Sequence, residues 1–203
     1  MPSPRSWAQS GTDSMGASRA GRVIEGAARA LAWCGGAIMA ALSVLTVVSI
    51  LGRALDGLGL GAIPGDYELM AHGCGIAVFF FLPWCQLKRG HVTVDIVTER
   101  FPPRVQALFG LFGDALITFA SVVILRQLWF AFGQKFPFGS DTLRGALGLG
   151  HRPFYVETTY ELQLPLWIPY ALALVGAAMM VVVGLYTVLR AAIWVRAGQE
   201  GRV

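Results

Sequence analysis

Charged residues are scarce in this chain of 203 residues. They make up 14% of it, whereas a typical soluble domain carries roughly 25%. Two runs hold no charge at all: 23 residues between Arg29 and Arg53, and 28 residues between Glu161 and Arg190. A helix needs roughly 20 apolar residues to cross the hydrocarbon core of a bilayer. The sequence therefore predicts a membrane protein with several spans. It excludes a soluble enzyme, a nucleic-acid-binding module and a disordered chain.

Cysteine is also rare, and the motifs of common catalytic sites are missing. Cys34, Cys74 and Cys85 lie in apolar runs and form no C-x-x-C pair, which argues against a disulfide framework, a zinc site and a thiol oxidoreductase. The chain contains no G-x-x-x-x-G-K-[ST], no G-x-S-x-G and no H-E-x-x-H motif. We therefore predict no enzymatic activity and no catalytic, metal-binding or cofactor-binding site.

Four apolar stretches are long enough to span a bilayer, at about residues 27–51, 66–87, 105–132 and 158–189. We predict an all-α polytopic membrane protein whose four transmembrane helices form one membrane domain at 23–197. A disordered tail at 1–22 would precede this domain, and a short tail at 198–203 would follow it.

Local signals refine these boundaries. Asp66 is a candidate N-cap for the second helix. Thr158-Thr159-Tyr160-Glu161 matches a capping box for the fourth helix. Between the second and third helices, residues 91–104 combine apolar and charged positions, and we expect an interfacial amphipathic segment there.

Basic residues are distributed unequally between the two sides of the predicted membrane domain. The two tails, their flanking helix ends and the connection between the second and third spans carry 11 Lys and Arg, and the opposite side carries 5. Because cytoplasmic loops of membrane proteins are enriched in Lys and Arg, this count predicts that both termini are cytoplasmic.

Two polar residues inside the spans deserve a functional interpretation. Asp114 lies deep in the third span, where a carboxylate serves either an ion or proton relay or a structural contact between helices. We favour the structural contact, because no second acid or base accompanies it. His72 lies in the second span, but haem ligation by two histidines needs another histidine at a facing depth. Ligation by Met39 or Met180 stays open.

Three sequence motifs resemble a known family of membrane proteins. Ile63-Pro64-Gly65-Asp66-Tyr67-Glu68 precedes the second span, which ends in Gln86-Leu87-Lys88-Arg89-Gly90-His91-Val92-Thr93-Val94-Asp95 and is followed by Phe101-Pro102. Thr158–Trp167 leads into the last span. Over about residues 25–195 this pattern resembles the small, DctQ-like membrane subunit of tripartite ATP-independent periplasmic (TRAP) transporters.

The resemblance implies a location in the inner membrane of a bacterium and a role as a scaffold. The small subunit would pair with a large membrane subunit that carries the substrate and sodium sites. A periplasmic solute-binding protein would deliver an organic anion, and sodium entry would drive its uptake as symport. The bilayer is the remaining partner, and no nucleic acid is expected.

Candidate partner contacts follow from small residues in the spans, from the family-like motifs and from charges in the loops. Small residues let helices approach closely in lipid, and two arginines after the third span, Arg144 and Arg152, are candidates for contact with the binding protein. The full set is Gly35, Gly36, Glu68, Arg89, His91, Asp95, Gly110, Gly113, Asp114, Arg144 and Arg152.

Two other functions stay open at this point. The chain could anchor a redox complex and bind haem or quinone, in which case the purified protein would show a Soret band. Alternatively, it could transport solute alone as a small oligomer, in which case it would support uptake by itself in proteoliposomes.

Overall fold

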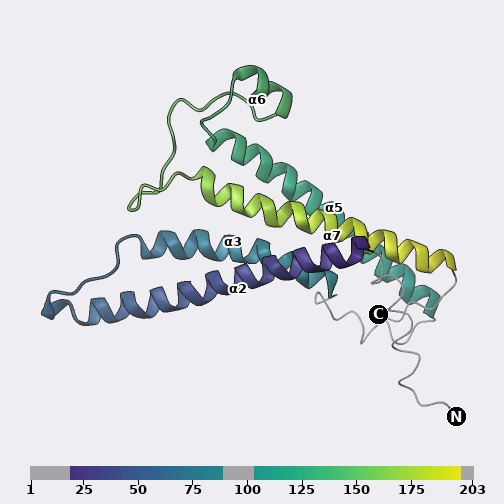
Figure 1. Cartoon of the computed structure of the whole chain (residues 1–203), viewed down its shortest axis with the longest axis horizontal. Helices are drawn as coiled ribbons and strands as arrows, with labels where there is room; N and C mark the ends of the chain where they lie inside the picture. Colours follow the sequence, from purple (N-terminus) through teal and green to yellow (C-terminus); the bar gives the residue numbers. More distant parts are fainter. Residues whose placement is uncertain (1–18, 89–102, 198–203) are drawn as a thin grey trace, which may run out of the picture.

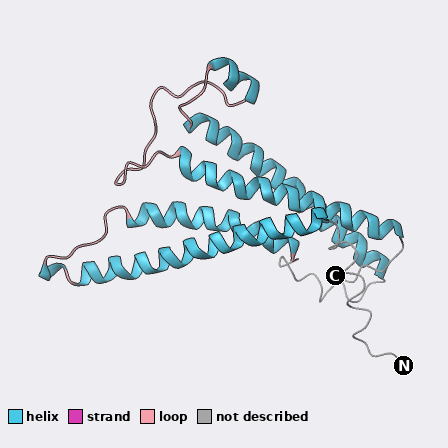
Figure 2. Cartoon of the chain, viewed as in Figure 1, coloured by secondary structure: helices cyan, strands magenta, loops and turns pink. Residues whose placement is uncertain are grey.

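The computed structural model describes residues 19–88 and 103–197 of the chain. These residues form four long helices and two short ones joined by loops (Figures 1 and 2). In chain order the elements are α2 (Arg19–Ala54), η1 (Asp56–Leu58), α3 (Asp66–Leu87), α5 (Pro103–Lys135), α6 (Asp141–Leu147) and α7 (Trp167–Ala197). Each long helix holds an apolar stretch long enough to cross a bilayer, so the predicted all-α fold with four membrane-spanning helices is confirmed.

The predicted boundaries agree with the helices to different degrees. The second span coincides with α3, whereas α2 and α5 extend beyond the predicted first and third spans. α2 begins at Arg19, inside the stretch predicted as a tail. The predicted interfacial segment lies outside the described residues, apart from its last two positions, which belong to α5.

The start of α3 differs from the predicted capping. Gly65 occupies the N-cap with φ 74°, and Asp66 is the first helical residue. The Asp66 carboxylate accepts a hydrogen bond from the backbone N–H of Tyr67 and another from the Ser49 hydroxyl of α2. The prediction of Asp66 as N-cap was wrong, because its side chain joins the ends of two helices instead of capping one.

The fourth long helix begins at Trp167, nine residues after the predicted start at Thr158. Residues 158–166 instead form a tight turn, in which Thr159 N–H donates to the Leu164 carbonyl and Leu166 N–H donates to the Glu157 carbonyl. Pro165 has no N–H to donate within a helix, so the chain becomes helical only after it. The capping-box prediction at Thr158 was therefore wrong.

The helices pack as an open row in the order α2, α3, α7, α5. α2 packs along α3, α3 packs along α7, and α7 packs along α5, and no extended interface between α2 and α5 occurs in the described residues. Figure 1 shows two helical hairpins, α2–α3 and α5–α7, which diverge toward the end that carries the α2–α3 loop. Among the described residues, an open row leaves the outer sides of α2 and α5 uncovered.

α7 is the most enclosed of the four helices, and glycines allow its close packing. In the most apolar 18-residue stretch of α7, 44% of the residues are buried, whereas 11% are buried in the corresponding stretches of α2 and of α5. A Cβ at Gly176 would lie 2.5 Å from the carbonyl oxygen of Phe79 in α3, and a Cβ at Gly184 would lie 2.7 Å from the Thr118 hydroxyl of α5. Small residues at these two positions therefore determine how closely α7 approaches both neighbours.

We predict that Gly176→Ala destabilises the folded chain, because its methyl group would collide with the backbone of α3. Overpacking of this kind costs about 1–3 kcal/mol, which exceeds the gain in helix propensity of about 1 kcal/mol. Thermal unfolding of the purified chain in detergent measures the effect. Gly36→Ala is the matched control, since nothing lies within 4 Å of a Cβ at that position. Equal melting temperatures for the two variants would contradict the prediction.

Candidate functional site: polar contacts between helices and loops

A buried polar cluster joins three of the four long helices. It consists of Gln86 from α3, Asp114 from α5 and Thr187 from α7, whose side chains are 2%, 9% and 0% exposed. Gln86 Nε2 donates to Asp114 Oδ1 at 3.0 Å and to Thr187 Oγ1 at 3.4 Å. An amide nitrogen carries two hydrogens, so Gln86 can serve both acceptors at once. We call these three residues the intramembrane cluster.

Hydroxyl groups next to the intramembrane cluster bond within their own helices. Thr187 Oγ1 donates to the Gly184 carbonyl at 2.9 Å, and Thr118 Oγ1 donates to the Asp114 carbonyl at 2.7 Å. The part of the chain that the structure describes contains no group of three or more His, Cys, Asp or Glu side chains placed to hold a metal ion. The contacts between helices in the cluster are those of Gln86, which joins α3 to α5 and α7.

The position of Asp114 refines the sequence prediction. A structural contact between helices was expected, with the large subunit as a candidate partner. The structure places this carboxylate between helices of its own chain, within hydrogen-bond distance of a residue 28 positions away. Gln86 is thus a partner of Asp114 within the same chain, and the burial of Asp114 leaves it unsuited to an outward contact.

Two carboxylates link the start of α3 to residues 136–166, the connection between α5 and α7 that we call the α6 loop. Glu68 Oε1 accepts from Glu161 N–H at 2.9 Å, and Glu68 Oε2 accepts from Leu162 N–H at 3.2 Å. The Glu161 carboxylate in turn accepts from Gly65 N–H. Each glutamate thus bonds to backbone beside the other, and Figure 1 shows the loop before α7 lying beside the start of α3. We call Glu68 and Glu161 the carboxylate clasp.

The carboxylate clasp lies at one end of an apolar groove of about 350 Å³ between α2, α3 and α7. His72 lines this groove, and its Nδ1 lies 2.8 Å from the Glu68 carbonyl oxygen of the preceding turn. Asp66 provides a further link nearby, since its carboxylate pairs with Arg53 at the end of α2. The ends of α2 and α3 and the α6 loop are therefore joined by side chains at this end of the molecule.

Arg144 organises the α6 loop from within. Its side chain is 1% exposed. Its guanidinium donates to six backbone carbonyls, those of Gly133, Phe136, Phe138, Leu149, Gly150 and His151, at 2.6–3.3 Å. The five N–H groups of an arginine are all accounted for by these acceptors. Contact with a binding protein is therefore not supported for Arg144, because its donors point into the loop.

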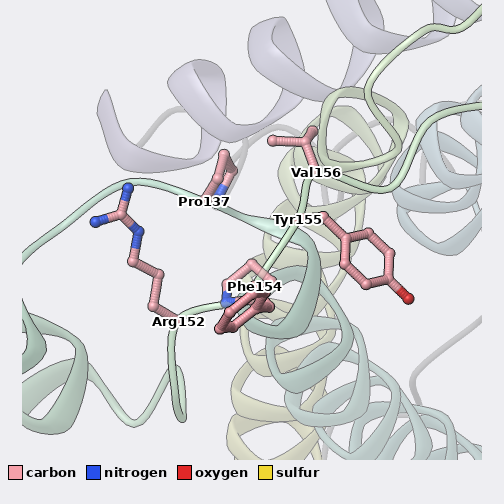
Figure 3. A pocket seen from close by; sticks show the side chains of 6 residues that line it. Pro137, Arg152, Phe154, Tyr155 and Val156 are labelled. Atoms are coloured by element: carbon pink, nitrogen blue, oxygen red, sulfur yellow. The ribbon is translucent and has the colours of Figure 1, made fainter.

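Arg152 remains exposed and lines a shallow pocket of about 330 Å³ on the α6 loop (Figure 3). The other lining residues are Pro137, Pro153, Phe154, Tyr155 and Val156. In Figure 3 the Arg152 side chain extends to one side of the loop and the ring of Tyr155 to the other. Arg152 can therefore reach a partner, and its predicted role stays a proposal.

The four glycines predicted as partner contacts fall into two groups. A Cβ at Gly35 would lie 3.2–3.3 Å from atoms of α3, so this glycine serves the α2–α3 contact inside the chain. For Gly36, Gly110 and Gly113, no atom of the described part of the chain lies within 4 Å of such a Cβ. These three are therefore open to an approaching helix.

The remaining predicted contacts, Arg89, His91 and Asp95, lie outside the described residues. Sequence reasoning also missed three residues of the site: Gln86, Glu161 and Thr187 were not predicted as site residues. Gln86 belongs to a polar run at the end of a span, which was a usable signal. Nothing in the 28-residue uncharged run that holds Thr187 distinguishes it from other small polar residues.

Gln86→Leu should lower the free energy of unfolding by about 1–2 kcal/mol, because Asp114 and Thr187 lose their shared donor while staying buried. Titration of the purified chain with a denaturing detergent, followed by circular dichroism, measures this. Gln127→Leu on the exposed side of α5 is the matched control. Asp114→Leu should lower the free energy of unfolding by less in the Gln86→Leu background than in the unmodified chain. A fully additive double variant would argue against the Gln86–Asp114 contact.

Arg144→Lys should loosen the α6 loop, since lysine has three donors and cannot bridge six carbonyls. Each hydrogen bond to a charged group contributes about 1.5–3 kcal/mol, so loss of two predicts more than about tenfold faster amide exchange in residues 137–151. Hydrogen exchange with mass spectrometry measures this, and Arg152→Lys is the exposed control. Unchanged exchange in Arg144→Lys would show that the carbonyl contacts do not hold the loop.

Comparison with protein families gives a match to a family of transporter components. The model described as "Tripartite ATP-independent periplasmic transporters, DctQ component" matches residues 42–193. This range includes α3, α5, α6, most of α7 and the second part of α2. Comparisons with curated proteins and with solved structures gave no match. The family is a transporter component and not an enzyme family. Because the matched range covers most of the chain, the protein belongs to the DctQ family, the small membrane subunit of TRAP transporters.

Proposed function

We propose that this chain is a scaffold for the large membrane subunit of a TRAP transporter that takes up an organic anion with sodium. A periplasmic solute-binding protein delivers the anion in this scheme. Membership of the DctQ family supports the proposal. The structural observation that carries it is the open row of helices, in which no other part of residues 19–88 and 103–197 covers an apolar side of α5.

The uncovered side of α5 has the spacing of a helix-packing seam. Phe112, Leu116, Phe119 and Val123 are all exposed, and they follow one another at intervals of four, three and four residues. This is the spacing at which one helix packs along another with a small crossing angle. The seam lies about 180° around α5 from Asp114 at 100° per residue. One side of α5 therefore packs within the chain, and the opposite side suits a helix of another subunit.

α2 offers a similar apolar side at the other edge of the row. Val44, Val47, Val48 and Leu51 are exposed and recur at helical spacing. Gly36, on the same helix, leaves room for close approach. Both edges of the row can thus extend a larger assembly of helices, which is the contribution that we assign to this subunit.

The proposed topology follows from the number of crossings. Four spans return the chain to the side on which it started, and the side with 11 Lys and Arg would face the cytoplasm. The α6 loop and the α2–α3 loop would then face the periplasm of a bacterial cell, where Arg152 is a candidate contact for the binding protein.

The test is co-purification of the large subunit with tagged variants of this chain. Phe112→Ala combined with Phe119→Ala should reduce recovery of the large subunit at least about tenfold, since each truncation of an aromatic anchor at an interface costs about 1 kcal/mol or more. Insertion and yield of the small subunit should not change. Leu185→Ala with Leu189→Ala, at exposed positions of α7, is the matched control. Equal recovery with both double variants would contradict α5 as the interface.

A further inference from the structure

The α6 loop folds back against the last turns of α5 instead of extending away from it. Trp129 Nε1 donates to the Leu147 carbonyl at 3.0 Å, which ties the end of α6 to a residue six positions before the end of α5 at Lys135. This corresponds to a depth of about 9 Å along the helix axis. A Cβ at Gly133 would lie 2.5 Å from the Leu149 carbonyl oxygen, so the backbones touch there as well. The loop therefore lies beside the membrane helix.

The Trp129–Leu147 contact has the features of a position at the boundary between water and hydrocarbon. Tryptophan side chains favour the headgroup level of a bilayer, with the ring in the apolar zone and the N–H bonded to a polar partner. Trp129 has this arrangement, and its partner is the backbone of α6. With Trp129 at the headgroup level, the Leu147 carbonyl bonded to it would lie at that level as well.

The apolar side chains of α6 lie on one side of the helix and small or charged residues on the other, as a position at the membrane boundary requires. Leu143 and Leu147 are one helical turn apart and are 60% and 54% exposed. Asp141 and Gly145 lie on the opposite side, at about 160° and 200° from Leu143. A short helix with leucines on one side and small or charged residues on the other lies in a membrane interface with its leucines toward the acyl chains.

Arg144 removes the main obstacle to such a position. Backbone carbonyls outside a regular helix need water or another donor, and donors are scarce near the acyl chains. Arg144 supplies N–H groups to six carbonyls of the α6 loop and of the end of α5, and it is itself buried. A loop in bulk water would gain little from this arrangement, because water would solvate the same carbonyls.

We infer that α6 is an interfacial helix, with Leu143 and Leu147 inserted at the boundary between lipid headgroups and acyl chains. The surface that it contacts is the bilayer itself, and Arg144 and Trp129 hold it at that depth. The helix would thus anchor the α6 loop, and with it the exposed Arg152, at a defined height above the membrane. This inference rests on the contacts within the chain and does not depend on the proposed large-subunit interface.

The test uses the complete transporter complex in vesicles of phosphatidylcholine and phosphatidylglycerol. Cys34, Cys74 and Cys85 are first replaced by serine, and one cysteine is then introduced by Leu143→Cys, Leu147→Cys, Asp141→Cys or Gly145→Cys. Each introduced cysteine is labelled with an environment-sensitive fluorophore. Iodide in the water should quench the labels at 143 and 147 about fivefold less than the labels at 141 and 145. A lipid with a nitroxide near its headgroup should give the opposite order, with stronger quenching at 143 and 147 than at 141 and 145.

Two results would overturn the inference. Equal iodide quenching at all four positions would place α6 in water. Protection of positions 143 and 147 from both iodide and the nitroxide lipid would show that another subunit covers the leucines. Co-purification of the large subunit with each labelled variant checks that the complex is intact, so a failure of the scaffold proposal would be seen separately from a failure of this one.

Discussion

The absence of water inside a bilayer is the constraint on which the rest of this structure depends. Polar groups there must find partners within the protein, and apolar side chains gain little by leaving lipid for another helix. Helices in such a solvent associate through close packing and through a few polar contacts. The chain uses both, with Gly176 and Gly184 at the closest approaches of α7 and Gln86 bonded to residues of two other helices.

The polar contacts hold α3 at both of its ends. Glu68 lies in its first turn and Gln86 in its last, about 27 Å apart along the helix axis. The first residue is tied to the α6 loop by the carboxylate clasp, and the second is tied to α5 and α7 by the intramembrane cluster. Two separated attachment points restrict rotation as well as sliding. Both attachment points join the α2–α3 hairpin to the α5–α7 hairpin.

An open row of helices suits a supporting subunit better than a closed bundle would. A bundle turns its small and polar residues inward and presents one kind of surface to lipid. In this chain the inner side of α5 carries Asp114 and Thr118, while its outer side carries Phe112, Leu116 and Phe119 at the spacing of a packing seam. The DctQ family match and this uncovered seam favour the same interpretation, in which the chain contributes a rigid frame to a larger membrane assembly.

The number and approximate position of the spans could be predicted from sequence, because the cost of placing charge in hydrocarbon acts on each residue almost independently of its neighbours. The second span, from Asp66 to Leu87, was predictable for this reason. The family resemblance likewise rested on local motifs at the ends of spans and was confirmed.

Tertiary structure alone decided which polar residues meet. Gln86 and Thr187 are 101 positions apart, and Glu68 and Glu161 come from different hairpins, so no local pattern in the sequence connects them. Arg144 was predicted to contact the binding protein because of its charge and its position in a loop. Six carbonyls of the folded loop and of the end of α5 instead accept its hydrogen bonds and compensate for the cost of its burial. Local composition thus determined what crosses the membrane. The partners of each buried polar group depended on the path of the whole chain, because a hydrogen bond requires two groups to lie within about 3 Å of each other.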